Sequence, residues 1–182
     1  SLVARMLNGD QVALVSDAGT PLISDPGYQL VRDAHAASIP VVPIPGPTAM
    51  AAALSASGLA TVSFLFLGFL RSKSTARIAI LQTLRYYPFS LVFYEAPHRI
   101  DKSISSMIDV FGGDRPACIA REMTKTFEQI VNGTLAELLA GLQSREIVSK
   151  GEFVVVVSGV SDNNVEFDDR TLLTHLLAEL AP

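Results

Sequence analysis

The first third of the chain alternates between short apolar runs and loops rich in Gly and Pro. Residues 11–16 and 39–44 are mostly apolar and predict two buried strands. Each run is followed by a turn-rich loop and then by a helical stretch. In the first helical stretch Leu30, Val31 and Ala34 lie on one face, and the second covers residues 48–57. Two strand–helix units in series predict a parallel sheet, because crossover helices cover both of its faces.

A second series of elements follows a short linker at residues 58–63. Its clearest member is a helix at residues 98–111, where apolar residues recur at helical spacing and polar residues occupy the other side. The remaining expected elements are strands at 64–69, 91–94, 117–121, 127–132 and 153–158, and helices near 74–86 and 135–142. The pattern predicts an α/β protein in which the linker separates two series of elements.

The linker sets the expected domain boundaries. We expect residues 1–58 to be the C-terminal part of a first domain, residues 59–161 a second α/β domain, and residues 162–182 the start of a helical extension. Two strands and two helices leave sheet edges and apolar faces uncovered, so the first domain is expected to be incomplete at its N-terminus. A leucine-rich helical stripe at residues 172–180 also lacks a partner, which predicts truncation at the C-terminus.

Composition is that of an ordinary globular protein, with 49% hydrophobic and 18% charged residues among 182. No apolar run approaches the roughly 20 residues that cross a bilayer, so no membrane association is expected. The single cysteine, Cys118, cannot form an internal disulfide, which favours the reducing cytoplasm. A net charge of −4 argues against a surface covered in positive charge, so composition alone does not indicate RNA binding.

The loop at residues 16–27 is the most informative segment, because it follows a predicted strand and precedes a helix. Open α/β sheets bind ligands in such loops. Gly19 lets the backbone approach a ligand, and Thr20, Ser24 and Asp25 offer hydrogen-bonding groups. The ordinary alternative is a turn in which Ser24 or Asp25 caps the next helix. The lysine of a P-loop and the glycine spacing of a dinucleotide-binding loop are both absent.

Five motifs, in order, resemble the ribosomal RNA branch of the tetrapyrrole methylase superfamily. They are SDAGTPLISDPG at 16–27, PIPGPTA at 43–49, FYEAPHR at 93–99, AREMTKTFE at 120–128 and KGEFV at 150–154. Each motif is weak evidence by itself, but five in the right order are specific. Together they extend over nearly all of residues 11–159.

The resemblance implies an enzyme of two α/β/α domains, usually a homodimer, that binds S-adenosylmethionine in the cleft between its domains. The cofactor-binding residues that it implies are Ala18, Gly19, Thr20 and Ile23 in the first loop, Thr48 and Ala49 in the second, and Glu95 and Met123 in the second domain. One departure is that the family opens with a strand and a proline-rich loop, which this sequence does not contain. Because that loop helps to form the active site, the polypeptide alone is expected to be inactive.

The implied reaction is methyl transfer to a ribose 2′-hydroxyl, of a cytidine, in small-subunit ribosomal RNA. Attack by a protonated hydroxyl is helped by a base or by a cation that stabilises developing negative charge. The cluster of Arg121, Glu122, Lys125 and Glu128 could supply both, with Glu122 and Lys125 as the catalytic candidates. Arg99 is a further candidate, as a contact to RNA or cofactor. The alternative for this cluster is a set of surface ion pairs. His98 is a candidate acid, base, phosphate contact or helix cap.

Other readings stay open on the sequence alone. One is a C-methyltransferase of corrin or porphyrin precursors, and another is a non-catalytic ligand-binding or dimerisation module. Lys150 and Glu152 either pair only with each other or lie at the sheet edge beside the site. Two groups of basic residues either form a phosphate-facing rim or belong to a solvated helix face. They are Arg71, Lys73 and Arg77, and Arg99 and Lys102. The scattered histidines do not indicate a metal site.

Overall fold

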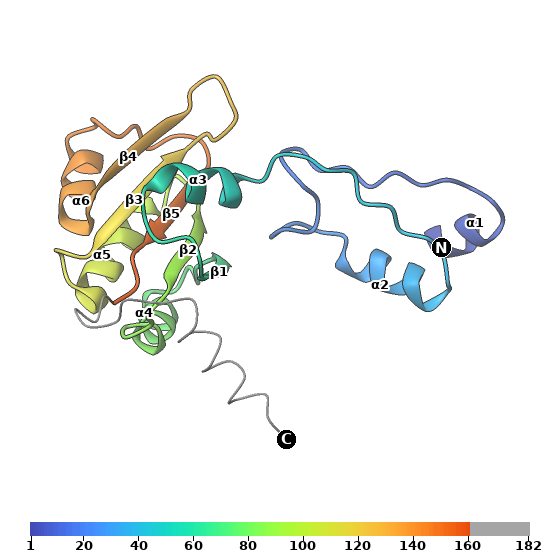
Figure 1. Ribbon diagram of the computed structural model, residues 1–182, viewed down its shortest axis with the longest axis horizontal. Helices are drawn as coiled ribbons and strands as arrows, with labels where there is room; N and C mark the ends of the chain where they lie inside the picture. Colours follow the sequence, from blue (N-terminus) through green and yellow to red (C-terminus); the bar gives the residue numbers. More distant parts are fainter. Residues whose placement is uncertain (161–182) are drawn as a thin grey trace.

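The computed structural model describes residues 1–160, so the predicted extension at 162–182 and its leucine stripe lie outside the described residues. Figure 1 shows a mixed sheet with helices on both faces and an N-terminal arm. The helices are α1 (Leu2–Leu7), α2 (Tyr28–Ala36), α3 (Ala49–Ser57), α4 (Ser74–Thr83), α5 (Ile100–Phe111) and α6 (Leu135–Gln143). The strands are β1 (Phe64–Phe69), β2 (Ser90–Glu95), β3 (Pro116–Arg121), β4 (Gln129–Thr134) and β5 (Phe153–Val157). Every element predicted between the linker and residue 160 is present, within a few residues at its ends.

The five strands form one sheet in the order β1-β2-β5-β3-β4. β1 and β2 are parallel, and the other neighbouring strands are antiparallel. Strand β5 lies in the middle and is apolar along its whole length, because helices cover both of its faces. Its first residue, Phe153, pairs with both Glu95 and Arg121, which end β2 and β3. The sheet therefore brings three motif segments together at one edge.

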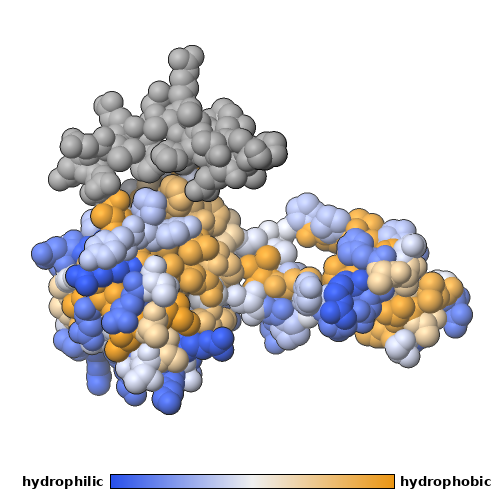
Figure 2. Space-filling model, turned by 90° about the horizontal axis from the view of Figure 1, so that it is seen from below, coloured by the Kyte–Doolittle hydropathy of each residue, from blue (hydrophilic) through white to orange (hydrophobic). Residues whose placement is uncertain are grey.

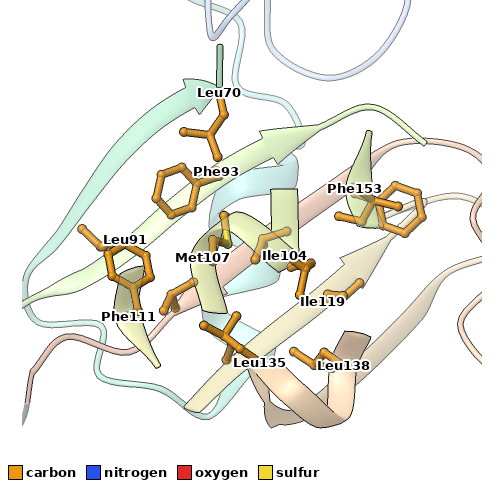
Figure 3. Packing of buried hydrophobic residues seen from close by; sticks show 14 of the residues in the cluster. Leu70, Leu91, Phe93, Ile104, Met107, Phe111, Ile119, Leu135, Leu138 and Phe153 are labelled. Atoms are coloured by element: carbon orange, nitrogen blue, oxygen red, sulfur yellow. The ribbon is translucent and has the colours of Figure 1, made fainter. Parts of the chain in front are cut away.

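Helices on the two faces bury two apolar layers. On one face α4, α5 and α6 enclose the larger layer, in which residues from β2, β3 and β5 meet Ile104 and Met107 of α5 (Figure 3). Both side chains are at most 1% exposed, as the helical spacing predicts. On the other face, α3 packs Ala53 and Leu54 against Val92 and Val156. The small side chains of α3 allow this close approach.

The N-terminal arm, residues 1–48, differs from the prediction. It projects from the sheet in Figure 1 and contains α1, which the pattern did not predict, and α2, which it did. Neither predicted strand forms: residues 11–16 and 39–44 are without ladder pairing. Val15, Val42 and Ile44 are 81%, 75% and 80% exposed, and Figure 2 shows apolar surface on this arm, at the right of the view. An apolar run becomes a strand only when another strand satisfies its backbone groups, and residues 1–160 offer these two runs none.

Candidate active site

A cavity lies where the loops of the N-terminal arm meet the edge of the sheet. It contains roughly 970 Å³ of empty space, part of which is open to solvent. Its walls are formed by Ala18, Gly19, Thr20, Ile23, Ser24, Asp25, Pro47, Thr48, Ala49, Phe69, Tyr94, Glu95, Met123, Thr124, Lys125, Glu152, Phe153 and Val154. All eight residues expected to bind the cofactor are among them. They come from positions up to 105 residues apart, between Ala18 and Met123.

Hydrogen bonds connect the first loop to the second. The Thr20 hydroxyl donates to the carbonyl oxygen of Pro47 at 3.1 Å, and the Ser16 hydroxyl donates to the Gly19 carbonyl at 2.8 Å. Gly19 has φ +71°, and a Cβ there would lie 3.2 Å from the Pro47 carbonyl oxygen. The loops approach this closely because residue 19 has no side chain.

The capping alternative for the first loop is not observed. Helix α2 begins after Gly27, and no side chain accepts a hydrogen bond at its N-terminus. Ser24 and Asp25 line the cavity instead. Ser24 has φ +59° and its hydroxyl faces Gly68, which sits at a register shift in β1. The loop therefore presents its polar groups to the cavity.

The start of α3 is fixed against the sheet. The Thr48 hydroxyl accepts a hydrogen bond from the Ala51 amide at 3.1 Å and caps the helix. The Met50 amide donates to the Tyr94 hydroxyl at 3.2 Å. Burial raises the pKa of Tyr94, so this phenol stays protonated at neutral pH. Its ring packs edge-on against Phe69, with ring centres 5.7 Å apart.

Glu95 is a buried carboxylate whose two oxygens both have donors. It is 2% exposed. One oxygen accepts from the Ala96 amide at 2.9 Å and from the Arg99 guanidinium at 2.6 Å, and the other accepts from the Ser103 hydroxyl at 2.5 Å. Arg99, predicted as a contact to RNA or cofactor, does not line the cavity and instead holds Glu95 in place. A buried carboxylate needs such a partner.

The loop after β3 places Lys125 between two carboxylates at the cavity wall. Its ammonium group donates to Glu122 Oε1 at 3.1 Å and to Glu152 Oε2 at 2.9 Å. The hydrogen bond to Glu152 is the main cause of a raised pKa for Lys125. The backbone amide of Glu152 and then Lys125 lower the pKa of Glu122. Both groups are therefore charged at neutral pH, and Lys125 is a cation there. Glu122 itself does not line the cavity.

Strained backbone surrounds this site. Leu22 and Ser24 in the first loop and Glu122 and Thr124 in the loop after β3 have φ between +50° and +72°. They are four of the six non-glycine residues with positive φ among residues 1–160. Such conformations persist where the surroundings enforce them, and they cluster at functional sites. Their distribution supports the cavity as the functional site of this chain.

Several other predictions are corrected or left without support. Arg77 is 4% exposed and donates to the Ser106 hydroxyl at 3.0 Å and to the carbonyls of Arg71 and Ser72, so it is not part of a solvent-facing phosphate rim. His98 does not cap α5, whose N-cap is Arg99. Burial raises the pKa of Cys118 to about 11.

Two kinds of feature are absent from residues 1–160. No helix within this range is long and apolar enough to cross a membrane. The same residues contain no group of three or more His, Cys, Asp or Glu side chains placed to hold a metal ion.

Phe69 and Tyr94 are among the cavity residues that were not predicted as site residues, and Glu152 was expected either to pair with Lys150 or to lie at the sheet edge beside the site. Their positions at strand ends were the available signal, because the ends of strands β1 and β2 and the start of β5 meet at this edge. The sequence alone does not reveal that β5 runs antiparallel to its neighbours. The start of β5, and not its end, therefore reaches the site.

The family model for tetrapyrrole (corrin/porphyrin) methylases matches residues 1–139. The chain belongs to this family. Three curated relatives are named ribosomal RNA small subunit methyltransferase I. The one from Xylella fastidiosa strain Temecula1 is 50% identical over 90% of this chain and 60% of the relative. Those from Pseudomonas aeruginosa and Escherichia coli O157:H7 are 48% and 44% identical over 98% and 99% of this chain, and over 64% of each relative.

Solved structures share the fold. Cobalt precorrin-4 methyltransferase gives a TM-score of 0.63 at 18% identity, covering 86% of this chain and 69% of that one. Uroporphyrin-III C-methyltransferase from Thermus thermophilus, solved in complex with S-adenosylhomocysteine, gives 0.58 at 16% identity, covering 86% and 70%. Among the eight curated relatives compared, the chain spans between 56% and 65% of each relative's length.

Proposed function

We propose that this chain forms the donor-binding part of an S-adenosylmethionine-dependent methyltransferase that methylates a ribose 2′-hydroxyl, of a cytidine, in small-subunit ribosomal RNA. The observation that carries the proposal is that the loops carrying the family-like motifs converge on one cavity. Residues from the loop at 16–27, the loop at 43–49 and the ends of β2 and β3 surround the same space. Relatives of 44–50% identity bear the name of a ribosomal RNA methyltransferase, which favours RNA over a tetrapyrrole as the acceptor.

The residues around the cavity fit a donor of this kind. Ala18, Gly19 and Ala49 leave room for a ligand close to the backbone, and Ile23 and Met123 supply apolar surface. A mostly apolar wall with a few fixed polar groups is typical of small-molecule sites. S-adenosylmethionine would supply an electrophilic methyl group, and these residues would bind and orient it.

Positioning is the main demand of the reaction on the protein. Methyl transfer is an in-line displacement, so holding the two reactants in the right geometry provides much of the rate. Glu95 is held by three donors, and the two loops are held together through Thr20 and Pro47. The open side of the cavity, where Lys125 and Glu152 are 38% and 69% exposed, would admit the RNA.

The proposal includes a cytoplasmic location, where small ribosomal subunits are available, and a homodimeric assembly. Within residues 1–160 no strand pairs with the outer edge of β1, which supports a further protein contact. Phe64 and Phe69 in edge strand β1 are 42% and 52% exposed. An apolar edge strand is usually covered, because it otherwise pairs with other chains.

Calorimetric titration of the natural full-length protein with S-adenosylhomocysteine tests the location of the donor site. Ala49→Leu would fill the cavity beside the start of α3 and is expected to weaken binding at least tenfold. Ala56→Leu is the matched control, because Ala56 lies on the same helix, is exposed and does not line the cavity. Equal affinities for wild type and Ala49→Leu would contradict this location, and no binding by wild type would contradict the methyltransferase proposal itself.

A further inference from the structure

Glu152 lines the cavity, and within residues 1–160 one of its carboxylate oxygens is held by the protein while the other has no hydrogen-bond partner. Its Oε2 accepts a hydrogen bond from the Lys125 ammonium at 2.9 Å. Its Oε1 accepts no hydrogen bond from residues 1–160. The residue stands immediately before β5, between the ends of β2 and β3, and it lines the cavity.

Glu122 fixes both the backbone and the side chain of Glu152. Glu122 Oε1 accepts the Glu152 amide at 2.9 Å and the Lys125 ammonium at 3.1 Å. The Glu122 amide in turn donates to the Glu152 carbonyl at 2.9 Å, which extends the pairing of β3 with β5 by one residue. Because Lys125 also binds Glu152 Oε2, one carboxylate and one ammonium orient the second carboxylate. Oriented charges of this kind are common in catalytic sites.

The other titratable groups on the cavity wall are less suited to accept a proton. Both oxygens of Glu95 already accept hydrogen bonds, and Lys125 is protonated because its pKa is raised. Tyr94 has a raised pKa and accepts the Met50 amide. Asp25 is exposed, and no side chain or backbone group in the described part of the chain holds its carboxylate. Glu152 is thus the carboxylate that is both oriented and free.

We propose that Glu152 is the catalytic base for the acceptor hydroxyl, with Lys125 and Glu122 as its positioning residues. The proposal rests on the methyl transfer proposed above. The hydroxyl O–H bond breaks and its proton passes to Glu152 Oε1, while the oxygen forms a bond to the methyl carbon. The carbon–sulfur bond of the donor breaks and its electron pair stays on sulfur. The proton then leaves Glu152 for solvent, which reaches this exposed side chain.

The direct test compares Glu152→Gln with wild type in the full-length protein, using small ribosomal subunits as the acceptor. The amide keeps the shape but cannot take the proton, so kcat is expected to fall about 100-fold, because general bases contribute roughly 10²–10⁴-fold. The calorimetric Kd for S-adenosylhomocysteine and the Tm are expected to match wild type. Glu146→Gln, an exposed glutamate outside the cavity, is the matched control and should keep the wild-type kcat.

The values of kcat and KM distinguish a positioning role of Lys125 from a contact between Lys125 and an RNA phosphate. Lys125→Met is expected to lower kcat at unchanged KM for the subunit, with partial recovery in Lys125→Arg, because the arginine retains a cation beside Glu152. A raised KM at unchanged kcat would make Lys125 an RNA contact and overturn this role.

Two results would overturn the assignment of Glu152 itself. One is a Glu152→Gln enzyme within threefold of wild type. The other is loss of kcat in Asp25→Asn with Glu152→Gln unaffected. Absence of turnover in the wild type would contradict the proposed function instead, so the two failures are distinguishable.

Discussion

Replacing Gly151 with alanine should destabilise the protein through two separable effects. Gly151 has φ +83°, a conformation that costs an L-residue roughly 1–2 kcal/mol. A methyl group there would also overlap the carboxyl group of Glu122 and push it from the Glu152 amide and the Lys125 ammonium. Losing such hydrogen bonds to a charged group costs about 1.5–3 kcal/mol. The free energy of unfolding is therefore expected to fall by about 2.5–5 kcal/mol.

Urea denaturation followed by circular dichroism measures this change, and the chain offers a matched control. Gly58 has φ +67° and ψ 10° in the left-handed region, and a Cβ there would meet nothing within 4 Å. Gly58→Ala should therefore show only the backbone effect, about 1–2 kcal/mol. Gly151→Ala should also lose most of its excess effect when combined with Glu122→Ala, because the clash is then absent. Equal destabilisation by the two glycine variants would refute the reasoning.

Further predictions concern the charged cluster and the core. Because the pKa of Glu122 lies below its ordinary 4.5, its contribution to stability is present above pH 4.5 and is lost as pH falls through the lowered pKa. Thermal melts in this acidic range should therefore depend less on pH in Glu122→Gln than in wild type, and parallel curves would contradict the pairing. Ile104→Ala should reduce the free energy of unfolding by about 2–5 kcal/mol, because this fully buried side chain packs between the sheet and the neighbouring helices; a loss below 1 kcal/mol in urea denaturation would contradict that packing. Buried Cys118, whose pKa is raised to about 11, should react with a maleimide at neutral pH only on unfolding, and rapid labelling of the native protein would contradict its burial.

The second half of the chain could be predicted because local pattern and tertiary burial agree there. The helical spacing of Ile104 and Met107 and the apolar run of β5 each have one stable solution, since a covering layer is present. The runs at 11–16 and 39–44 have the same pattern without strand partners, so they remain unpaired. Hydrophobic pattern indicates what a segment can become, and its neighbours decide whether it does so.

The site was predictable in its loops and less so in its charges. Resemblance indicated the eight expected cofactor residues, which the fold brings to one cavity. The roles in the charged groups depend on which partner each carboxylate has: Glu95 is buried against Arg99, whereas Glu152 is exposed and pairs with Lys125. Sequence spacing does not specify those partners. The pairing of Glu152 follows from the antiparallel placement of β5, which brings this residue beside the loop after β3.

The most direct test of the central claim is to incubate the full-length protein with labelled S-adenosylmethionine and small ribosomal subunits, then digest the RNA and identify the modified nucleoside by mass spectrometry. Label on a cytidine ribose 2′-oxygen, abolished by Ala49→Leu and retained in Ala56→Leu, is the predicted result. Absence of label from the RNA, with label on carbon in a parallel incubation that offers a tetrapyrrole in place of the subunits, would contradict the account.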